Sequence, residues 1–516
     1  MASSRTRNTA INISTAIASQ VVTVILSFFT RTALIRTLGI QAVSLNGLFA
    51  EIITMLSMAE LGVGSAIVYN LYKPLSENDE KKVCQLMTLF QTAYRVIALV
   101  IFTAGLLLTP FIQYLVNSID YPLSYIRLVY VLFVIQSASS YLFAYKSSLL
   151  MADQKKYVVT IITLEARTVN AVVTVAVLYL TGNYIFYLCI QILFNFSSNV
   201  LSALYVDKTY PYLRKDSSMP REEKKNIFRN VKYLFMDTIA YRTINSTDNI
   251  LISTLVSTLQ VGYYSNYNVF FNIIRQLQSN FSQSITGSLG NLLVTETPEH
   301  CIRVLNRLNY LFYVMGFALS LGMFACVSSV VRLWLGADFL LPEAVVFVSC
   351  LNLFVNFCKA PLWQMMGVSG LFRDNKNISI VGCVTNLVVS VALGVKLGMV
   401  GVFLGTTATS LVELVLKVRL LFGKSFHVSV KKYVARWCYY LLSFLTAQAG
   451  ILWFASVVRL ENLFVQVLVN GVAAVVLSIP FCVLVFMKNE DFRFAVDLVR
   501  SRMPIEKHRK ERGESK

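Results

Sequence analysis

The chain has 516 residues, of which 56% are hydrophobic and 14% are charged, with a mean hydropathy of +0.62 and a formal net charge of +19. A soluble protein of this length would normally divide into several domains with about a quarter of its residues charged. Apolar stretches of about 20 residues, the length that crosses a bilayer, recur from end to end. These properties exclude a soluble protein and predict a polytopic membrane protein.

The first apolar stretch follows a short basic N-terminus and lacks a signal-peptide cleavage pattern, so we expect an uncleaved helix. Hydropathy and turn signals place spans near 12–35, 43–69, 84–108, 123–145, 158–180, 184–206, 231–257, 262–290, 307–327, 343–366, 377–395, 400–416, 437–457 and 463–487. The second, seventh and eighth are the most polar, and hydropathy alone would miss them. The predicted fold class is all-α and polytopic, with 14 transmembrane helices in two six-helix lobes followed by two C-terminal helices.

The domain organisation follows from this grouping of spans. The predicted parts are an N-lobe at 1–206, a cytoplasmic linker at 207–230, a C-lobe at 231–421, a final helix pair at 422–487 and a polar cytoplasmic tail at 488–516. Both lobes begin on the cytoplasmic side, as expected for parallel repeats related by an axis along the membrane normal.

Basic residues fix the orientation, because Lys and Arg accumulate in cytoplasmic loops. Four of the 46 lie in segments predicted to be external, namely Arg36, Arg332, Lys396 and Arg459. We therefore expect both termini to be cytoplasmic. The basic linker 207–230 could bind anionic lipid headgroups, but we favour a role in setting topology. Because the positive charge falls in alternate short loops, a nucleic-acid partner is not expected.

The sequence contains no pattern for a cofactor, a metal or catalysis. The nine cysteines form no CxxC pair, and the three histidines are scattered. The one candidate phosphate loop, LLFGKSF at 420–426, has Val418 where the motif requires glycine. No nucleophile, metal cluster or acid–base pair is placed for catalysis, so we expect no cofactor and no enzymatic activity.

Ionisable side chains inside predicted spans are informative, because each costs at least ~2.5–3.5 kcal/mol near mid-bilayer if it faces lipid. Arg31 lies toward the outer end of the first span, and Arg95 lies deep in the third. Lys359 lies in the cytoplasmic half of the tenth span, where its stem could also reach the interface. Arg242 and Arg275 lie near the middle of the seventh and eighth spans, where their side chains cannot easily reach either membrane surface.

Polar stripes surround these two central arginines. The seventh span carries Thr238, Arg242, Asn245 and Asn249, and the eighth carries Asn268, Asn272, Arg275 and Ser279, each at spacings of 4, 3 and 4. Hydrogen bonds between helices would explain such stripes, but we favour a water-filled cavity. Arginine suits an anionic phosphate, because its fork of donors stays charged without a proton supply.

Acidic residues accompany the arginines. Glu51 and Glu60 in the second span and Asp248 in the seventh could balance the arginines or carry coupling protons. Glu60 precedes Gly62 and Gly64, which we expect to let this helix bend or pack closely near its cytoplasmic end. Glu60 is thus a candidate gate or coupling acid, with a structural ion pair as the open alternative. Lys359 is a further coupling or gating candidate.

Glu165 and Arg167 lie about two turns into the fifth span from the cytoplasmic side. A structural ion pair with a neighbouring helix and a functional role explain them equally well.

Three stretches give the sequence a specific resemblance. They are LIRTLG at 34–39, AELGVGSAIVYNLYKPLSENDEKK at 59–82 and DNILISTLVSTLQVGYYSNYNVFFNIIRQL at 248–277. Together with the two groups of six spans plus two, they resemble bacterial polysaccharide and O-antigen (Wzx-type) flippases of the multidrug/oligosaccharidyl-lipid/polysaccharide (MOP) exporter superfamily. The resemblance covers nearly the whole chain.

The resemblance implies a V-shaped pair of lobes around a central cavity that works by alternating access in the bacterial inner membrane. The implied substrate is an undecaprenyl-diphosphate-linked oligosaccharide, moved from the inner to the outer leaflet for surface polysaccharide assembly, with a polysaccharide polymerase as a partner. We expect Arg31, Arg95, Arg242 and Arg275 to engage the diphosphate, and residues such as Tyr241 and Asn272 to meet sugar. The near-neutral sum of charges within the spans departs from the strongly cationic cavity typical of the family.

A second function remains open on the same fold. A small-molecule or multidrug exporter coupled to H⁺ or Na⁺ would bind amphipathic cations through acids. In that case Glu51, Glu60 and Asp248 would carry function and the arginines would not.

Overall fold

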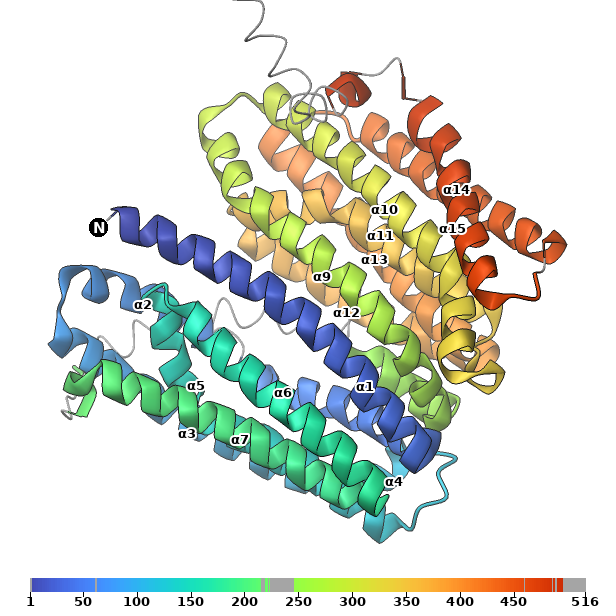
Figure 1. Cartoon of the computed structure of the whole chain (residues 1–516). Coiled ribbons are helices and arrows are strands. Elements are labelled where there is room, and N and C mark those ends of the chain that lie inside the picture. Colours follow the sequence, from blue (N-terminus) through green and yellow to red (C-terminus); the bar gives the residue numbers. More distant parts are fainter. Residues whose placement is uncertain are drawn as a thin grey trace, which may run out of the picture. The chain divides into compact units, whose positions relative to one another are not determined.

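The computed structural model describes residues 2–60, 63–214, 219–220, 222, 246–458, 460–484, 486–487 and 490–494. Within these residues the chain is helical and contains no β-strand (Figure 1). Eleven of the described helices are long and apolar enough to cross a membrane. The predicted fold class is confirmed, because the long helices are consistent with fourteen spans.

The chain forms two compact units, residues 1–265 (the N-unit) and 266–516 (the C-unit). The N-unit contains α1 (Ala2–Leu56), α2 (Val63–Glu77), α3 (Glu80–Leu108), α4 (Ile112–Leu115), α5 (Leu123–Ala152), α6 (Lys156–Thr181), α7 (Tyr184–Thr209) and a helical segment at 246–255. Helix α9 (Thr258–Thr295) begins in the N-unit and continues into the C-unit. The predicted lobe boundaries stay a prediction, because most of 215–245 lies outside the described residues.

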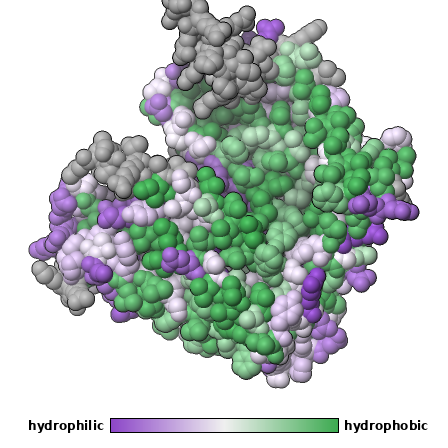
Figure 2. Space-filling model, viewed as in Figure 1, coloured by the Kyte–Doolittle hydropathy of each residue, from purple (hydrophilic) through white to green (hydrophobic). Residues whose placement is uncertain are grey.

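The C-unit continues with α10 (Pro298–Leu335), α11 (Glu343–Val368), α12 (Phe372–Leu397), α13 (Met399–Leu421), α14 (Lys431–Val457) and α15 (Leu463–Ile479). A π-helical turn follows α13 at Phe422–Phe426, and another follows α15 at Pro480–Leu484. In each unit, Figure 2 shows hydrophobic side chains over much of the visible outer surface, as a lipid-facing surface requires.

Among the described residues, hydropathy does not identify the second and eighth predicted spans as separate membrane helices. The first predicted span and part of the second lie in one long helix, α1, whose only internal break in helical geometry is at Gly39, with φ of 73°. Because a side chain is strained at positive φ, glycine is the residue suited to this break. The seventh span lies largely outside the described residues, and the eighth lies within α9.

The stretch around Glu60 is interrupted rather than continuous. Helix α1 ends at Leu56, a 3₁₀ turn covers Ser57–Glu60, and α2 begins at Val63. A Cβ atom at Gly64 would lie 3.2 Å from the Tyr94 hydroxyl oxygen of α3, so a side chain here would crowd the tyrosine. The helical geometry thus changes just before these glycines, and the hydrogen bond from Tyr94 holds Glu60 beside α3.

The end of the N-unit that contains the turn between α5 and α6 is held by hydrogen bonds between segments far apart in sequence. Asn12 of α1 donates its Nδ2 to the Gln154 carbonyl (2.9 Å) and accepts from the Tyr157 backbone N–H (2.6 Å), which ties α1 to the turn between α5 and α6. At the end of α7, the Tyr210 hydroxyl donates to Asp153, which also pairs with Lys155 at 2.7 Å. Burial and the Asp153 carboxylate both raise the pKa of Tyr210, so this phenol stays protonated as a donor.

Close helix packing and stacked aromatic rings hold the C-unit together. The rings of Phe354 on α11 and Phe444 on α14 stack at 4.1 Å and 5°, and Tyr313 on α10 stacks on Tyr440 at 4.0 Å and 13°. Helices α12 and α13 approach so closely that a Cβ at Gly405 would overlap the backbone and hydroxyl of Ser390. Small residues at such contacts let two helix backbones meet within a membrane.

We expect Gly405→Ala to destabilise the C-unit, because the added methyl must displace the Ser390 backbone of α12. Overpacking of this kind costs about 1–3 kcal/mol. The melting temperature of the detergent-solubilised protein, measured by fluorescence-detection size exclusion, should fall. Gly322→Ala on α10 is the matched control, since a Cβ there meets open space. Equal melting temperatures for the two variants would show that the α12–α13 approach is not tight.

Candidate substrate cavity

The N-unit contains a polar cavity made of two adjoining hollows. One, of about 370 Å³, is lined by Asn46, Ala50, Ile53, Phe133, Gln136, Ser137, Ser140, Tyr187, Leu188, Gln191 and Asn195. The other, of about 570 Å³, is lined by Glu60, Ser140, Tyr141, Ala144, Thr163, Ala166, Arg167, Asn170, Gln191, Phe194, Asn195, Ser198 and Asn199. They share Ser140, Gln191 and Asn195, so one continuous wall borders both.

Helix α7 contributes one polar face to the cavity. On α7 the lining residues Tyr187, Gln191, Asn195 and Asn199 recur every four positions, which places them one above the other. Another face of α7 carries Phe186 and Leu193, which are exposed and apolar as lipid contact requires.

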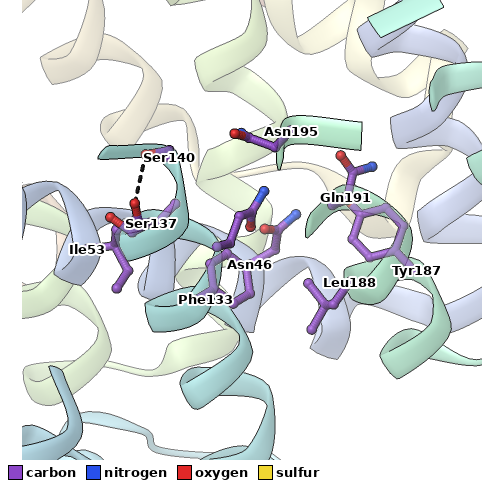
Figure 3. Close-up of a pocket in the computed structure, with 11 residues that line it drawn as sticks. Asn46, Ile53, Phe133, Ser137, Ser140, Tyr187, Leu188, Gln191 and Asn195 are labelled. Atoms are coloured by element: carbon purple, nitrogen blue, oxygen red, sulfur yellow. Dashed lines mark hydrogen bonds between the residues drawn. The ribbon is translucent and has the colours of Figure 1, made fainter. Parts of the chain in front are cut away.

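Amide groups of α1 and α7 line the smaller hollow together. Figure 3 shows Asn46 of α1 between the α5 serines Ser137 and Ser140 and the α7 residues Gln191 and Tyr187. The side chains that face the hollow are therefore mostly neutral hydrogen-bonding groups drawn from α1, α5 and α7.

A hydrogen-bonded chain orients part of this lining. Asn170 of α6 donates its Nδ2 to the Gln191 Oε1 at 2.8 Å, and the Thr174 hydroxyl donates to the Asn170 Oδ1 at 3.0 Å. Gln191 in turn donates to the Thr174 hydroxyl at 3.3 Å. Amides and hydroxyls both donate and accept, so a lining of this kind can follow the hydroxyl groups of a sugar.

Two charged side chains face the larger hollow. Glu60 accepts a hydrogen bond from the Tyr94 hydroxyl at 2.9 Å, which holds its carboxylate beside α3. Arg167 of α6 is exposed to the hollow, and the structure pairs it with no carboxylate among the residues it describes. An arginine without a carboxylate partner, in a cavity otherwise lined by neutral polar groups, keeps its five donors available for an anion.

Arg31 lies next to this cavity. Its Nη2 donates to the hydroxyl of Ser265 on α9, and the guanidinium lies near Tyr184 and Tyr187, the second of which lines the smaller hollow. Glu51 accepts a hydrogen bond from the Asn249 Nδ2 at 3.2 Å.

The remaining predicted residues of the N-unit are placed differently. Asp248 lies on the helical segment 246–255. Arg95 is exposed on α3 near Tyr145 and lines neither hollow. Arg242 and Tyr241 lie outside the described residues, so their roles stay predictions.

Two predicted residues of the C-unit are in direct contact. Arg275 of α9 donates its Nη1 to the Asn272 Oδ1 at 3.0 Å and to the Asn268 Oδ1 at 3.3 Å, and it lies over the Phe271 ring at 5.8 Å. Neutral amide oxygens thus hold the guanidinium, and its charge is not cancelled by these partners. Lys359 of α11 lies elsewhere in the C-unit and donates to the Ser410 hydroxyl of α13 at 3.0 Å.

The predicted site did not include most residues of the N-unit cavity. Gln136, Ser140, Gln191 and Asn195 carry no charge, and the sequence-based search followed ionisable groups. The spacing of four along α7, from Tyr187 to Asn199, is the signal that would have identified this face.

A water-filled cavity predicts selective chemical labelling on α7. In a background whose nine native cysteines are replaced by serine, Asn195→Cys should react with a membrane-impermeant methanethiosulfonate, because the reactive thiolate forms only in contact with water. Leu193→Cys, on the exposed apolar face of the same helix, is the matched control and should stay unlabelled. Equal labelling at both positions would contradict a polar cavity on one side of α7.

No family model and no curated protein matches the sequence. Solved structures do share its fold. The lipid II flippase MurJ in an inward closed conformation is 14% identical, with a TM-score of 0.67 over 92% of this chain and 99% of the MurJ chain.

Two multidrug transporters are similar as well. An inward-facing multidrug resistance MATE family transporter of the MOP superfamily is 13% identical, with a TM-score of 0.61 over 76% of this chain and 93% of its own. The Vibrio cholerae MATE transporter VcmN is 11% identical, with a TM-score of 0.56 over 82% and 99%. The chain therefore has the fold that MurJ shares with the MATE transporters.

Proposed function

We propose that this chain is a flippase that moves an undecaprenyl-diphosphate-linked oligosaccharide from the inner to the outer leaflet of the bacterial inner membrane for surface polysaccharide assembly. Movement would occur by alternating access, with both termini in the cytoplasm and without catalysis by the protein. A polysaccharide polymerase would receive the translocated units. The observation that carries this proposal is the N-unit cavity, which combines a wall of amides and hydroxyls with Arg167, an arginine that pairs with no carboxylate among the residues the structure describes.

The chemistry of the cavity matches the two polar parts of such a substrate. Gln191, Asn195 and Ser140 border both hollows and offer donors and acceptors suited to sugar hydroxyls. Arg167 offers the planar fork of donors that binds phosphate. An amphipathic drug cation would instead require an acid or an aromatic cage, and the hollow containing Arg167 contributes a single carboxylate, Glu60, among its lining residues.

The C-unit supplies a second candidate phosphate ligand. Arg275 is positioned by Asn268 and Asn272 without an acidic partner in these contacts, so its charge remains available to an anion. The lipid tail would remain in the bilayer, where transfer into water would cost about 0.8 kcal/mol for each CH₂ group. The fold shared with MurJ, named as a lipid II flippase, supports a lipid-linked substrate.

A cation-coupled small-molecule exporter is the second candidate, favoured by one observation. Glu60 faces the larger hollow with its carboxylate hydrogen-bonded to Tyr94, as an acid that binds a proton or a cationic drug would. The fold shared with MATE transporters fits this function equally. In that case Glu60→Gln would abolish drug resistance, and Arg167→Gln would leave it intact.

Replacing Arg167 tests the flippase directly. We expect Arg167→Gln to reduce export of surface glycan by at least about tenfold, because hydrogen bonds to a charged group contribute about 1.5–3 kcal/mol. The measurement is surface glycan per cell in a deletion strain complemented with each variant, at matched membrane levels of protein. Arg36→Gln removes an exposed guanidinium outside the cavity and is the matched control.

Normal glycan export by the Arg167→Gln variant would show that Arg167 does not bind the substrate. Drug sensitivity of the deletion strain, with normal surface glycan, would instead show that the protein is a small-molecule exporter.

A further inference from the structure

Three ionisable side chains and one tryptophan form a cluster inside the C-unit. Glu413 and Lys417 of α13 are buried, with 6% and 5% of their surfaces exposed, and Lys359 of α11 is half-buried. The ammonium groups of Lys359 and Lys417 lie 5.3 and 4.3 Å from the centre of the Trp363 ring. One aromatic ring is therefore shared by two lysines.

Of the three ionisable groups in this cluster, two are positively charged and one is negatively charged when ionised. The charged groups that act on Lys359 among the described residues are the Glu413 carboxylate and the Lys417 ammonium. Helix α12 adds the Cys383 thiol beside Glu413, and its Gly382 leaves the space that the carboxylate fills. The Glu413 carboxylate attracts the Lys359 ammonium, whereas the Lys417 ammonium repels it, at low exposure to water. Loss of one proton from Lys359 removes the repulsion between the two ammonium groups.

We infer that Lys359, Glu413 and Lys417 form a proton-binding site of the C-unit, at which Lys359 releases and regains one proton. On release the N–H bond of the ammonium breaks, its electron pair stays on Nζ, and the proton passes to water. Lys359 is the group that exchanges, because it is the most exposed of the three. Its partner Ser410 accepts a hydrogen bond from the ammonium at 3.0 Å and can donate one to the neutral amine.

Helix α11 connects this site to α9. Gln278 of α9 donates to the Asn356 carbonyl at 3.4 Å, and Thr286 donates to the Gln364 Oε1 at 2.8 Å, so the two contacts lie on either side of Lys359 along α11. Pro361 interrupts the helical hydrogen bonding two residues after Lys359, and such a position can change its bend.

Protonation of Lys359 is thereby linked to α9, the helix that carries Arg275. This inference deepens the proposed function by naming the proton as the coupling ion, and it depends on that function only for what is transported.

The fluorescence of Trp363 reports the protonation state directly in purified protein. We expect a one-proton titration in the wild type that disappears in Trp363→Phe and in Lys359→Met. Glu413→Gln should move its midpoint to lower pH by about one unit, because the ammonium loses an opposite charge. Lys417→Met should move it to higher pH by a similar amount, because a like charge is removed. Lys396→Gln, an exposed lysine of α12, is the control and should leave the midpoint unchanged.

A wild type without a titration that depends on Trp363, or midpoints that move in the same direction in Glu413→Gln and Lys417→Met, would overturn the site. Opposite shifts cannot arise from loss of packing alone. Gly382→Ala keeps all three ionisable groups but displaces the Glu413 carboxylate, and it should also lower the midpoint.

Transport measurements separate the coupling from the proposed function. In proteoliposomes, flipping of a lipid-linked oligosaccharide should depend on pH in the wild type and lose that dependence in Lys359→Met. Flipping that is independent of pH in the wild type would contradict proton coupling while leaving the flippase intact. Absence of flipping would contradict the flippase, and the Trp363 titration would still decide the proton site.

Discussion

Hydrocarbon cannot hydrogen-bond, and this constraint governs both the fold and the site. Every backbone N–H and C=O within a bilayer must find a partner in the protein, so the spanning segments are helices. Polar side chains obey the same rule and must face one another or water. Apolar residues such as Leu180, which is 83% exposed, cover the outside of the N-unit, and amides gather around its cavity.

The two units satisfy this constraint by different means. In the N-unit, neutral amides and hydroxyls surround two hollows with few charges, which suits a large polar ligand. In the C-unit, charges are enclosed in small groups, with Arg275 held by two asparagines and Lys359 grouped with Glu413 and Lys417. The N-unit cavity is therefore suited to hydrogen bonding with a polar ligand, whereas the C-unit encloses a compact group of ionisable side chains.

The fold class could be predicted from the sequence, because the length and hydropathy of each apolar stretch identify a membrane-spanning helix without knowledge of its neighbours. The sequence also indicated that the helical geometry changes near Glu60 and that Asn268, Asn272 and Arg275 share one face of a helix, since both depend on the local sequence of a single segment. The span predicted at 400–416 ends one residue before Lys417, whereas Lys417 lies within α13 and is buried beside Trp363. The N-unit cavity required knowledge of which helices are neighbours, because Asn46 and Gln191 are far apart in the chain. Arg242 and Tyr241 lie outside the described residues and remain predictions.

Reconstitution tests the central claim most directly. Purified protein is placed in liposomes whose inner leaflet contains an undecaprenyl-diphosphate-linked oligosaccharide, and an impermeant lectin detects glycan that reaches the outer leaflet. We predict that active protein exposes the inner pool, that heat-denatured protein does not, and that an amphipathic cationic dye loaded in the same liposomes is retained. Export of the dye, with the glycan still inaccessible to lectin, would contradict the account.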